Sequence, residues 1–336
     1  MVMEVGVLVV SLLLIVVGAE TFTNALEHLG ERLGISEGVT GSIFAAVGTA
    51  LPEAMVPVVA IFAGSGTLTT RHEVGVGSIL GAPLMLSTLT FFLLAVMASL
   101  HRGWGSVFTP EPTGLLRDLS WFLLAFLGAV LAVFIPLEWK GVRLAVALGL
   151  TLVYFFYLFV TIRASRSLVE QGHGTEADHP LFLNRVGLPA YLVTILLQLG
   201  IGLGVIIGGA KGFVFGVEHV ASWAGVSTLA LSLLIIPVAT ELPEKVNSLI
   251  WVRRGRDTLA FGNITGAMVF QGSLLPALGV LLTPWAPRLE VLLGMTITLI
   301  ASGYLFMMVR RQALRPYHLL VNGACYGLFV VVVLTM

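Results

Sequence analysis

Long apolar segments constrain this chain more than any other feature of its sequence. A helix crosses the hydrocarbon core of a bilayer with about 20 mostly apolar residues, and about ten segments of that kind follow one another along the chain. They lie near residues 5–27, 37–63, 73–100, 116–136, 141–162, 187–217, 226–251, 257–283, 289–309 and 316–336. Only 11% of the residues are charged, whereas a soluble domain carries about a quarter. The sequence therefore predicts an all-α polytopic membrane protein and argues against a soluble enzyme.

The charge balance and the cysteine content exclude further classes of protein. Eighteen basic residues balance 18 acidic ones, whereas a nucleic-acid-binding protein carries a basic patch. The one cysteine, Cys325, allows no internal disulfide and no cysteine-ligated metal cluster. The first apolar segment follows no basic residue and ends at no small-residue cleavage site. We therefore interpret it as a retained transmembrane helix rather than a signal peptide.

The basic residues are distributed unequally between the two ends of the predicted spans. Twelve of the 18 fall in the loops after spans one, three, five, seven and nine, and four fall in the other loops. The positive-inside rule places the side with the twelve basic residues in the cytoplasm. Both termini then face outward, and the long polar stretch 163–185 is a cytoplasmic loop. We expect a multi-pass protein of the plasma or inner membrane.

The two halves of the chain resemble each other when one is shifted by 191 residues. Gly18-Ala19 then matches Gly209-Ala210, and Leu51-Pro52-Glu53 matches Leu242-Pro243-Glu244. Five spans in each half is an odd number, so the second copy must cross the membrane in the opposite sense. The sequence predicts two inverted five-helix repeats joined by a cytoplasmic linker, with boundaries at 1–163, 164–186 and 187–336. Secondary transporters often have this architecture, with the substrate site near the membrane midplane.

Each copy carries a polar motif within an apolar segment. The two motifs read Gly48-Thr49-Ala50-Leu51-Pro52-Glu53 and Ala239-Thr240-Glu241-Leu242-Pro243-Glu244. Threonine and glutamate, four apart, share a helix face, and the proline leaves the carbonyl of Gly48 or Ala239 without its helical donor. These hard oxygen ligands suit sodium or calcium. A charge at mid-span costs about 2.5–3.5 kcal/mol, so we interpret Glu53 and Glu244 as metal ligands rather than as groups that only join helices.

A glycine-rich segment follows each motif, and an extra acid distinguishes the second copy. Glycines four apart, such as Gly77 and Gly81, allow close helix packing. Asn263 and Gln271 lie on one stripe, where their amides can offer oxygens to a cation or join helices. Glu241 stands where the first copy has an alanine. Two readings stay open for it: a proton-coupling carboxyl beside Glu244, or a helix pair with Lys245 four residues later.

With these motifs the chain resembles the calcium/cation antiporter superfamily, the sodium/calcium exchanger membrane family, as a divergent prokaryotic-type member. That family carries Gly-Thr-Ser-x-Pro-Glu followed by Gly-Asn-x-x-Gly-Ser-Asn, and the resemblance covers both halves. It implies a central cation site on the two Pro-Glu glutamates. The predicted cation-binding residues are Glu53, Glu244, Thr49, Thr240, Glu241, Asn263, Gln271 and Ser78, with the backbone carbonyls of Ala46, Gly48, Pro237 and Ala239. Ala50 and Leu86 depart from the family pattern and weaken its sodium sites.

The predicted function is antiport of calcium, or a related cation, for sodium or protons by alternating access at this site. We expect no enzyme activity and no cofactor other than the transported ions. The expected partners are the lipid bilayer and small inorganic cations, without nucleic acid, and the sequence is compatible with a monomer. Two alternatives stay open: a degenerate, non-transporting member that binds a membrane partner, and an intramembrane hydrolase, for which a nucleophile motif is missing.

Overall fold

The computed structural model describes residues 2–32, 46–64, 67–169, 179–224, 227–255, 257–311 and 314–335, and the regular structure in these ranges is helical throughout. The α-helices are α1 (Val2–Arg32), α3 (Ala46–Ala63), α4 (Leu68–Met85), α5 (Phe91–Arg102), α6 (Pro112–Ala132), α7 (Lys140–Val169), α8 (Leu192–Ala224), α9 (Thr228–Thr240), α10 (Leu242–Arg253), α11 (Asp257–Leu282), α12 (Leu289–Arg310) and α13 (Leu320–Thr335). A π-helical turn, η2 (Leu86–Thr90), joins α4 to α5, and the short 3-10 helices η3 (Phe182–Val186) and η4 (Pro316–Leu319) precede α8 and α13.

Seven helical segments in the described ranges are long and apolar enough to cross a membrane. They are Leu68–Arg102, Pro112–Ala132, Lys140–Thr161, Leu192–Gly216, Ala260–Leu282, Leu289–Arg310 and Pro316–Thr335. Shorter apolar helices lie at Gly6–Phe22, Glu53–Ala63 and Thr228–Val238. The helical class agrees with the prediction, while the count of ten spans and their division into two repeats stay predictions.

The predicted span 226–251 is not one continuous helix, because α9 and α10 meet at Glu241. The backbone of Glu241 has φ −94° and ψ 6°, and a proline occupies the first turn of α10. Proline is tolerated there because the first N–H groups of a helix have no intrahelical partner. In the first half, α3 continues unbroken through the matching Pro-Glu motif. The two copies of the motif therefore differ in backbone, and the break falls at the extra acid of the second copy.

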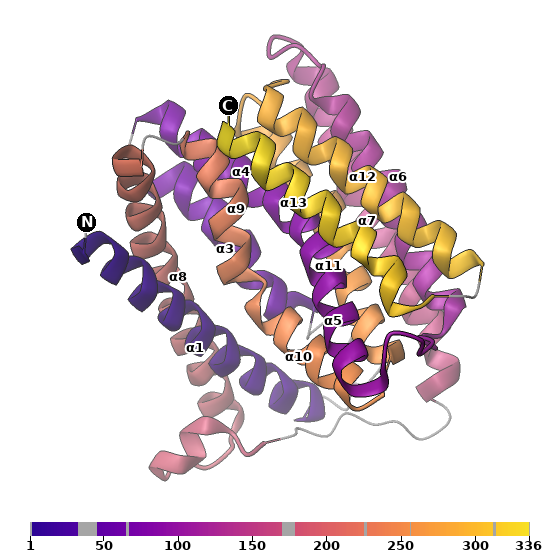
Figure 1. Cartoon of the computed structure of the whole chain (residues 1–336). Helices are drawn as coiled ribbons and strands as arrows, with labels where there is room; N and C mark the ends of the chain where they lie inside the picture. Colours follow the sequence, from indigo (N-terminus) through magenta and orange to yellow (C-terminus); the bar gives the residue numbers. More distant parts are fainter. Residues whose placement is uncertain are drawn as a thin grey trace.

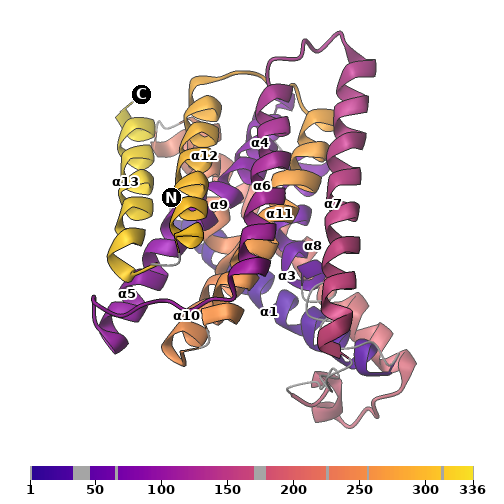
Figure 2. The same ribbon diagram turned by 90° about the vertical axis from the view of Figure 1, so that its right-hand side faces the viewer.

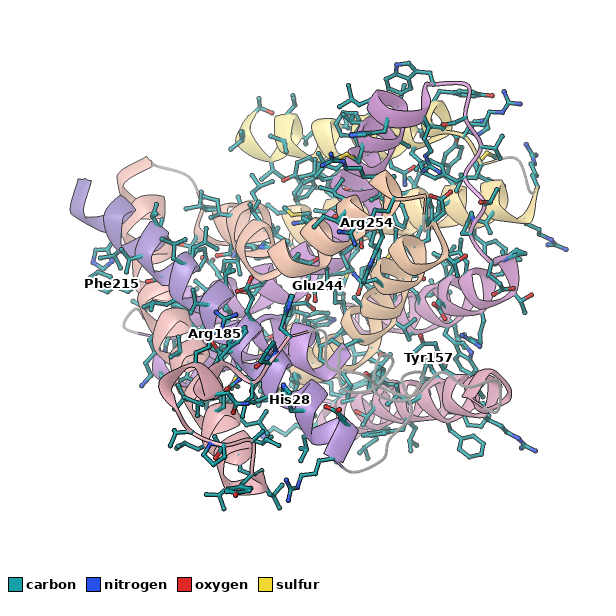
Figure 3. All side chains as sticks on the ribbon, turned by 90° about the horizontal axis from the view of Figure 1, so that it is seen from below. His28, Tyr157, Arg185, Phe215, Glu244 and Arg254 are labelled. Atoms are coloured by element: carbon teal, nitrogen blue, oxygen red, sulfur yellow. The ribbon has the colours of Figure 1, made fainter. Side chains whose placement is uncertain are left out.

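The helices form three groups side by side (Figure 1). α1 and α8 pack along each other on one flank, with glycines at their interface: a Cβ added to Gly209 would lie 2.9 Å from the Ile15 side chain. On the other flank α13, α12, α6 and α7 run next to one another (Figure 2). The helices α3, α4, α9 and α10 lie between these flanks. Seen from below, Glu244 of α10 is near the middle of the molecule, whereas Phe215 of α8 and Tyr157 of α7 lie towards opposite sides (Figure 3).

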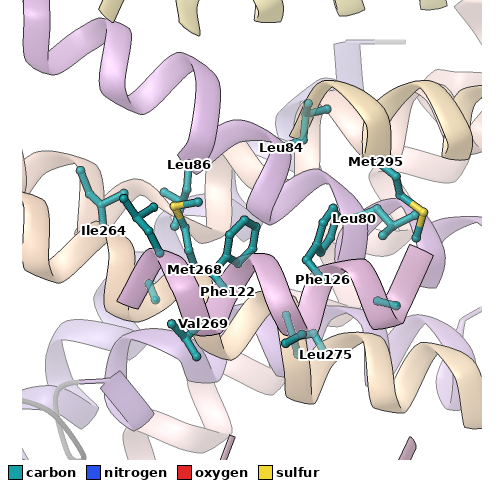
Figure 4. Packing of buried hydrophobic residues seen from close by; sticks show 14 of the residues in the cluster. Leu80, Leu84, Leu86, Phe122, Phe126, Ile264, Met268, Val269, Leu275 and Met295 are labelled. Atoms are coloured by element: carbon teal, nitrogen blue, oxygen red, sulfur yellow. The ribbon is translucent and has the colours of Figure 1, made fainter. Parts of the chain in front are cut away.

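A buried apolar cluster between α4, α6, α11 and α12 fixes the position of α11 (Figure 4). The rings of Phe122 and Phe126 on α6 stack with centroids 5.2 Å apart. Gly272 of α11 lies against Phe122, since a Cβ at this glycine would be 2.6 Å from the ring. Interiors packed this closely leave a helix little freedom to shift. The cluster therefore fixes the segment of α11 that carries the neighbouring Gln271.

Polar contacts hold both ends of α11. At its start, Asp257 accepts two hydrogen bonds from the Arg102 guanidinium, at 2.8 and 3.0 Å, and one from the Thr109 N–H at 2.9 Å. At its end, the buried guanidinium of Arg143 donates to the carbonyls of Thr283 at 2.7 Å and Pro284 at 3.1 Å. The last carbonyls of a helix have no intrahelical donor, so Arg143 satisfies acceptors next to the end of α11.

Candidate functional site

Three glutamates are buried in the middle of the helix bundle. Glu53 on α3 is 2% exposed, Glu241 at the α9–α10 junction is 0% exposed, and Glu244 on α10 is 1% exposed. Glu53 interacts electrostatically with Glu244, and Glu241 with both. Carboxylates in such surroundings are costly unless charge and hydrogen bonds compensate them. The two Pro-Glu motifs, 191 residues apart in the sequence, thus contribute to a single polar site.

Gln271 of α11 connects the acids of the two halves. Its side-chain nitrogen donates to Glu53 Oε2 at 2.8 Å and to Glu241 Oε1 at 2.9 Å. The sequence predicted that the Gln271 amide offers its oxygen to a cation or joins helices. In this structure its nitrogen faces the carboxylates, and a ligand role for its oxygen stays a prediction. One amide therefore ties together α3, the α9–α10 junction and α11.

A buried lysine completes this cluster. Lys245 is 5% exposed, and its ammonium donates to the Pro237 carbonyl at 3.1 Å and contacts the Met85 sulfur at 2.7 Å. It interacts electrostatically with all three glutamates. The sequence predicted the Pro237 carbonyl as a cation ligand, and the structure places a cationic side chain on it. The spacing of Glu241 and Lys245 was the signal available in the sequence, but it did not predict this carbonyl as the acceptor.

The remaining predicted ligands make local contacts. Thr240 Oγ1 donates to the Ile236 carbonyl at 3.3 Å, and Ser78 Oγ donates to the Val74 carbonyl at 2.6 Å, each within its own helix. Asn263 Nδ2 donates to the Glu244 carbonyl at 3.3 Å and to Ser248 Oγ at 3.1 Å, which joins α11 to α10. A ligand role for these residues stays a prediction.

Three further predicted positions, which contribute backbone carbonyls, lie at helix ends. Ala46 and Gly48 begin α3, and Ala239 lies in the last turn of α9. The predicted Thr49 hydroxyl lies outside the side chains that the structure describes. Within the described residues, no group of three or more His, Cys, Asp or Glu side chains is arranged to hold a metal ion. The site described here consists of carboxylates compensated by an amide and an ammonium group.

The sequence did not predict the buried acid Asp118, which lies outside the central site. Asp118 of α6 accepts hydrogen bonds from the Tyr157 hydroxyl at 3.2 Å and the Thr265 hydroxyl at 3.0 Å, and the Arg117 guanidinium lies 3.5 Å away. The sequence did contain a signal for it, because Asp118 is an acidic residue within the predicted apolar span 116–136. These contacts join α6, α7 and α11 and involve none of the residues of the central site.

Apolar helices of spanning length, with ionisable groups buried among them, define an integral multi-pass membrane protein. The model of the family described as sodium/calcium exchanger protein matches residues 3–163 and 194–335, so the chain belongs to this family. The resemblance of the chain to this family is thereby confirmed. The chain is also 27% identical over 286 residues to the inner membrane protein YrbG of Escherichia coli (strain K12), covering 84% of this chain and 81% of that protein.

Two solved structures share the fold. The crystal structure of the H+/Ca2+ exchanger CAX has a TM-score of 0.72 at 14% identity, covering 99% of this chain and 87% of that one. The sodium-calcium exchanger NCX_Mj, soaked with Na+ and Sr2+, has a TM-score of 0.61 at 20% identity, covering 98% of each chain. At these identities the likeness concerns the fold alone.

Proposed function

We propose that the protein is a secondary antiporter that exchanges calcium, or a related cation, for sodium or protons. The observation that carries the proposal is the burial of Glu53 with Glu241 and Glu244, acids from the two halves of the chain, in one site. Carboxylates together with backbone and hydroxyl oxygens suit hard cations such as calcium and sodium. The neighbours CAX and NCX_Mj are described as calcium exchangers, which supports the same substrate class here.

In this proposal the chain's own groups alternate between two sets of partners. Glu53 and Glu244 bind the cation, together with the oxygens predicted on Thr49, Thr240, Ser78 and Asn263 and on the carbonyls of Ala46, Gly48 and Ala239. The carbonyl of Pro237, also predicted as a ligand, accepts from the Lys245 ammonium. Without the cation, the amide of Gln271 compensates the acids, and the ammonium of Lys245 stays beside them with or without the cation. The protein spans the membrane as two inverted repeats, 1–163 and 187–336, with a cytoplasmic linker and outward termini. Alternating access then exposes the site to each side in turn.

Calcium flux in liposomes tests the proposal. We expect the purified protein to take up calcium when a sodium gradient or a proton gradient, imposed separately, supplies the driving force. Glu53→Gln and Glu244→Gln should each reduce this flux to the level of empty liposomes, because a neutral amide cannot balance the cation's charge. Glu138→Gln is the matched control, since Glu138 is exposed between α6 and α7, and its flux should be unchanged.

Two outcomes would contradict the assignment. Near-normal flux in both Glu53→Gln and Glu244→Gln would show that these acids do not bind the transported cation. Flux no greater than that of empty liposomes, for every gradient and cation tried, would favour a non-transporting role.

A further inference from the structure

Lys245 is an unusual occupant of a site proposed for cations. Its side chain is buried and extends from α10 to the sulfur of Met85 on α4. The matching position in the first copy, 191 residues earlier, is Ala54, so the repeat itself does not require a lysine here. A buried ammonium group is expensive unless opposite charge and acceptors surround it. The three glutamates supply the charge, and Lys245 therefore belongs to the site.

The acceptor of the ammonium is a backbone carbonyl within the proposed cation site. Pro237 O accepts from Lys245 Nζ at 3.1 Å and also from the Glu241 N–H at 3.2 Å. Carbonyl oxygens are ligands that alkali and alkaline-earth ions share with ammonium groups. With the ammonium in place, this carbonyl has both of its lone pairs engaged and has none left for a metal ion. The lysine thus satisfies a group that a bound monovalent cation would otherwise satisfy.

The charges of the motifs support the same reading. Relative to the first copy, the second adds an acid, Glu241 for Ala50, and a base, Lys245 for Ala54. The three buried carboxylates and one ammonium leave a formal charge of −2, the same as two glutamates alone. Without the lysine, the formal charge would be −3, and low-dielectric surroundings disfavour a carboxylate that no cation compensates.

We infer that Lys245 is a tethered monovalent cation that fills one cation position of the site. The exchanger therefore binds one monovalent cation fewer in each cycle than the same site would with a neutral residue at 245. The inference rests on the proposed function and concerns its stoichiometry: Lys245 determines how many coupling ions accompany each calcium ion.

The charge moved per calcium ion tests this inference for sodium and protons alike. Proteoliposomes with defined calcium and coupling-ion gradients are held at set potentials with potassium and valinomycin, and the potential at which net calcium flux reverses gives the stoichiometry. We expect Lys245→Met to shift the charge per calcium by one elementary charge. Lys245→Arg, which keeps the cation, should retain the unsubstituted value. Lys211→Met is the matched control, because Lys211 lies exposed on α8, and it should also retain that value.

A double variant separates charge from structure. Glu241→Gln combined with Lys245→Met returns the formal charge to −2, so we expect it to move the same charge per calcium as the unsubstituted protein. If Lys245 only supported folding, removing the Glu241 carboxyl as well would not restore the behaviour of the unsubstituted protein. If Lys245→Met alone does not fold or transport, the double variant still tests the role of Lys245. Inactivity of the double variant would contradict the inference.

The failures of the two proposals are distinguishable. An unsubstituted protein that transports calcium, with the same charge per calcium in Lys245→Met, overturns the role of Lys245 and leaves antiport intact. If the charge moved per calcium ion is shifted in the double variant as well, the role of Lys245 is also overturned and antiport is left intact. An unsubstituted protein that transports no cation contradicts the proposed function, and this inference falls with it.

Discussion

Gln271 donates both amide hydrogens to carboxylates, one on Glu53 and one on Glu241. Hydrogen bonds to charged groups are stronger than neutral ones, and a buried acceptor that loses its donor destabilises the fold by the full cost of its desolvation. Gln271 is also completely buried, so water cannot replace it without repacking. At the scale of single residues, this amide keeps two acids from different halves of the chain in one site.

We expect Gln271→Leu to destabilise the protein by about 1–3 kcal/mol or more, because two buried carboxylates lose a donor. Unfolding of the detergent-solubilised protein, followed by denaturant titration, measures the change. Ser273→Ala on the same helix is the control, since the Ser273 hydroxyl donates to the Val269 carbonyl within α11. A loss of stability in Gln271→Leu no larger than that in Ser273→Ala would contradict the bridging role.

At the scale of helices, two glycine pairs with the same spacing of four residues, Gly77 and Gly81 on α4 and Gly262 and Gly266 on α11, differ in how closely they are packed. On α4, a Cβ added to Gly77 would lie 2.5 Å from Ser232 Cβ, and one added to Gly81 would lie 2.5 Å from the Leu233 carbonyl. On α11, a Cβ at Gly262 would meet nothing within 4 Å, and one at Gly266 would lie 3.8 Å from the Tyr157 hydroxyl. Close packing therefore depends on the first pair, which sets α4 against α9.

We expect Gly81→Ala to destabilise the protein by about 1–3 kcal/mol, the usual cost of overpacking. The added methyl group would press on the Leu233 backbone and on the ring of Pro237, whose carbonyl accepts from Lys245, so calcium flux should fall as well. Gly266→Ala should be neutral or slightly stabilising, because alanine favours a helix by about 1 kcal/mol over glycine. Thermal unfolding and liposome flux of the two variants check this contrast, which equal effects would contradict.

At the scale of the whole molecule, the central site lies between two flanks whose helices pack through different residue types. α1 and α8 pair through glycines on one flank, and larger apolar side chains fill the cluster around α6, α11 and α12 on the other. The connections that precede and follow α6 leave the bundle at opposite ends (Figure 2). These two connections therefore report which end of the molecule faces the cytoplasm.

We expect Lys140→Cys to react with a membrane-impermeant maleimide in intact cells, and Trp104→Cys to react only after permeabilisation. The positive-inside rule places the loop of Trp104 in the cytoplasm and that of Lys140 outside. Both side chains are exposed, and a Cys325→Ala background removes the native thiol. The opposite labelling pattern would reverse the proposed orientation.

The sequence alone determined the membrane class, the approximate location of the long apolar segments and the family, and it contained the pair of Pro-Glu motifs. These features depend on local patterns. The thickness of a bilayer fixes how many apolar residues a helix needs, and a proline or a glutamate within an apolar segment can be recognised without knowing the tertiary structure. Four residues of the central site, Glu53, Glu241, Glu244 and Gln271, were therefore predicted from the sequence as part of a cation site, whereas Lys245 was recognised only as a helix partner of Glu241.

Only the tertiary structure decided how these residues meet. Gln271 and Glu53 are 218 positions apart, and the end of the amide that faces the acids depends on how α11 packs against α3. The place of the Lys245 ammonium on Pro237 O depends on the break between α9 and α10 and on the nearness of α4. The difference between the glycine pairs likewise depends on which helix lies opposite each. Sequence spacing specifies the face of a helix, but the partner of that face follows from the packing of the whole bundle.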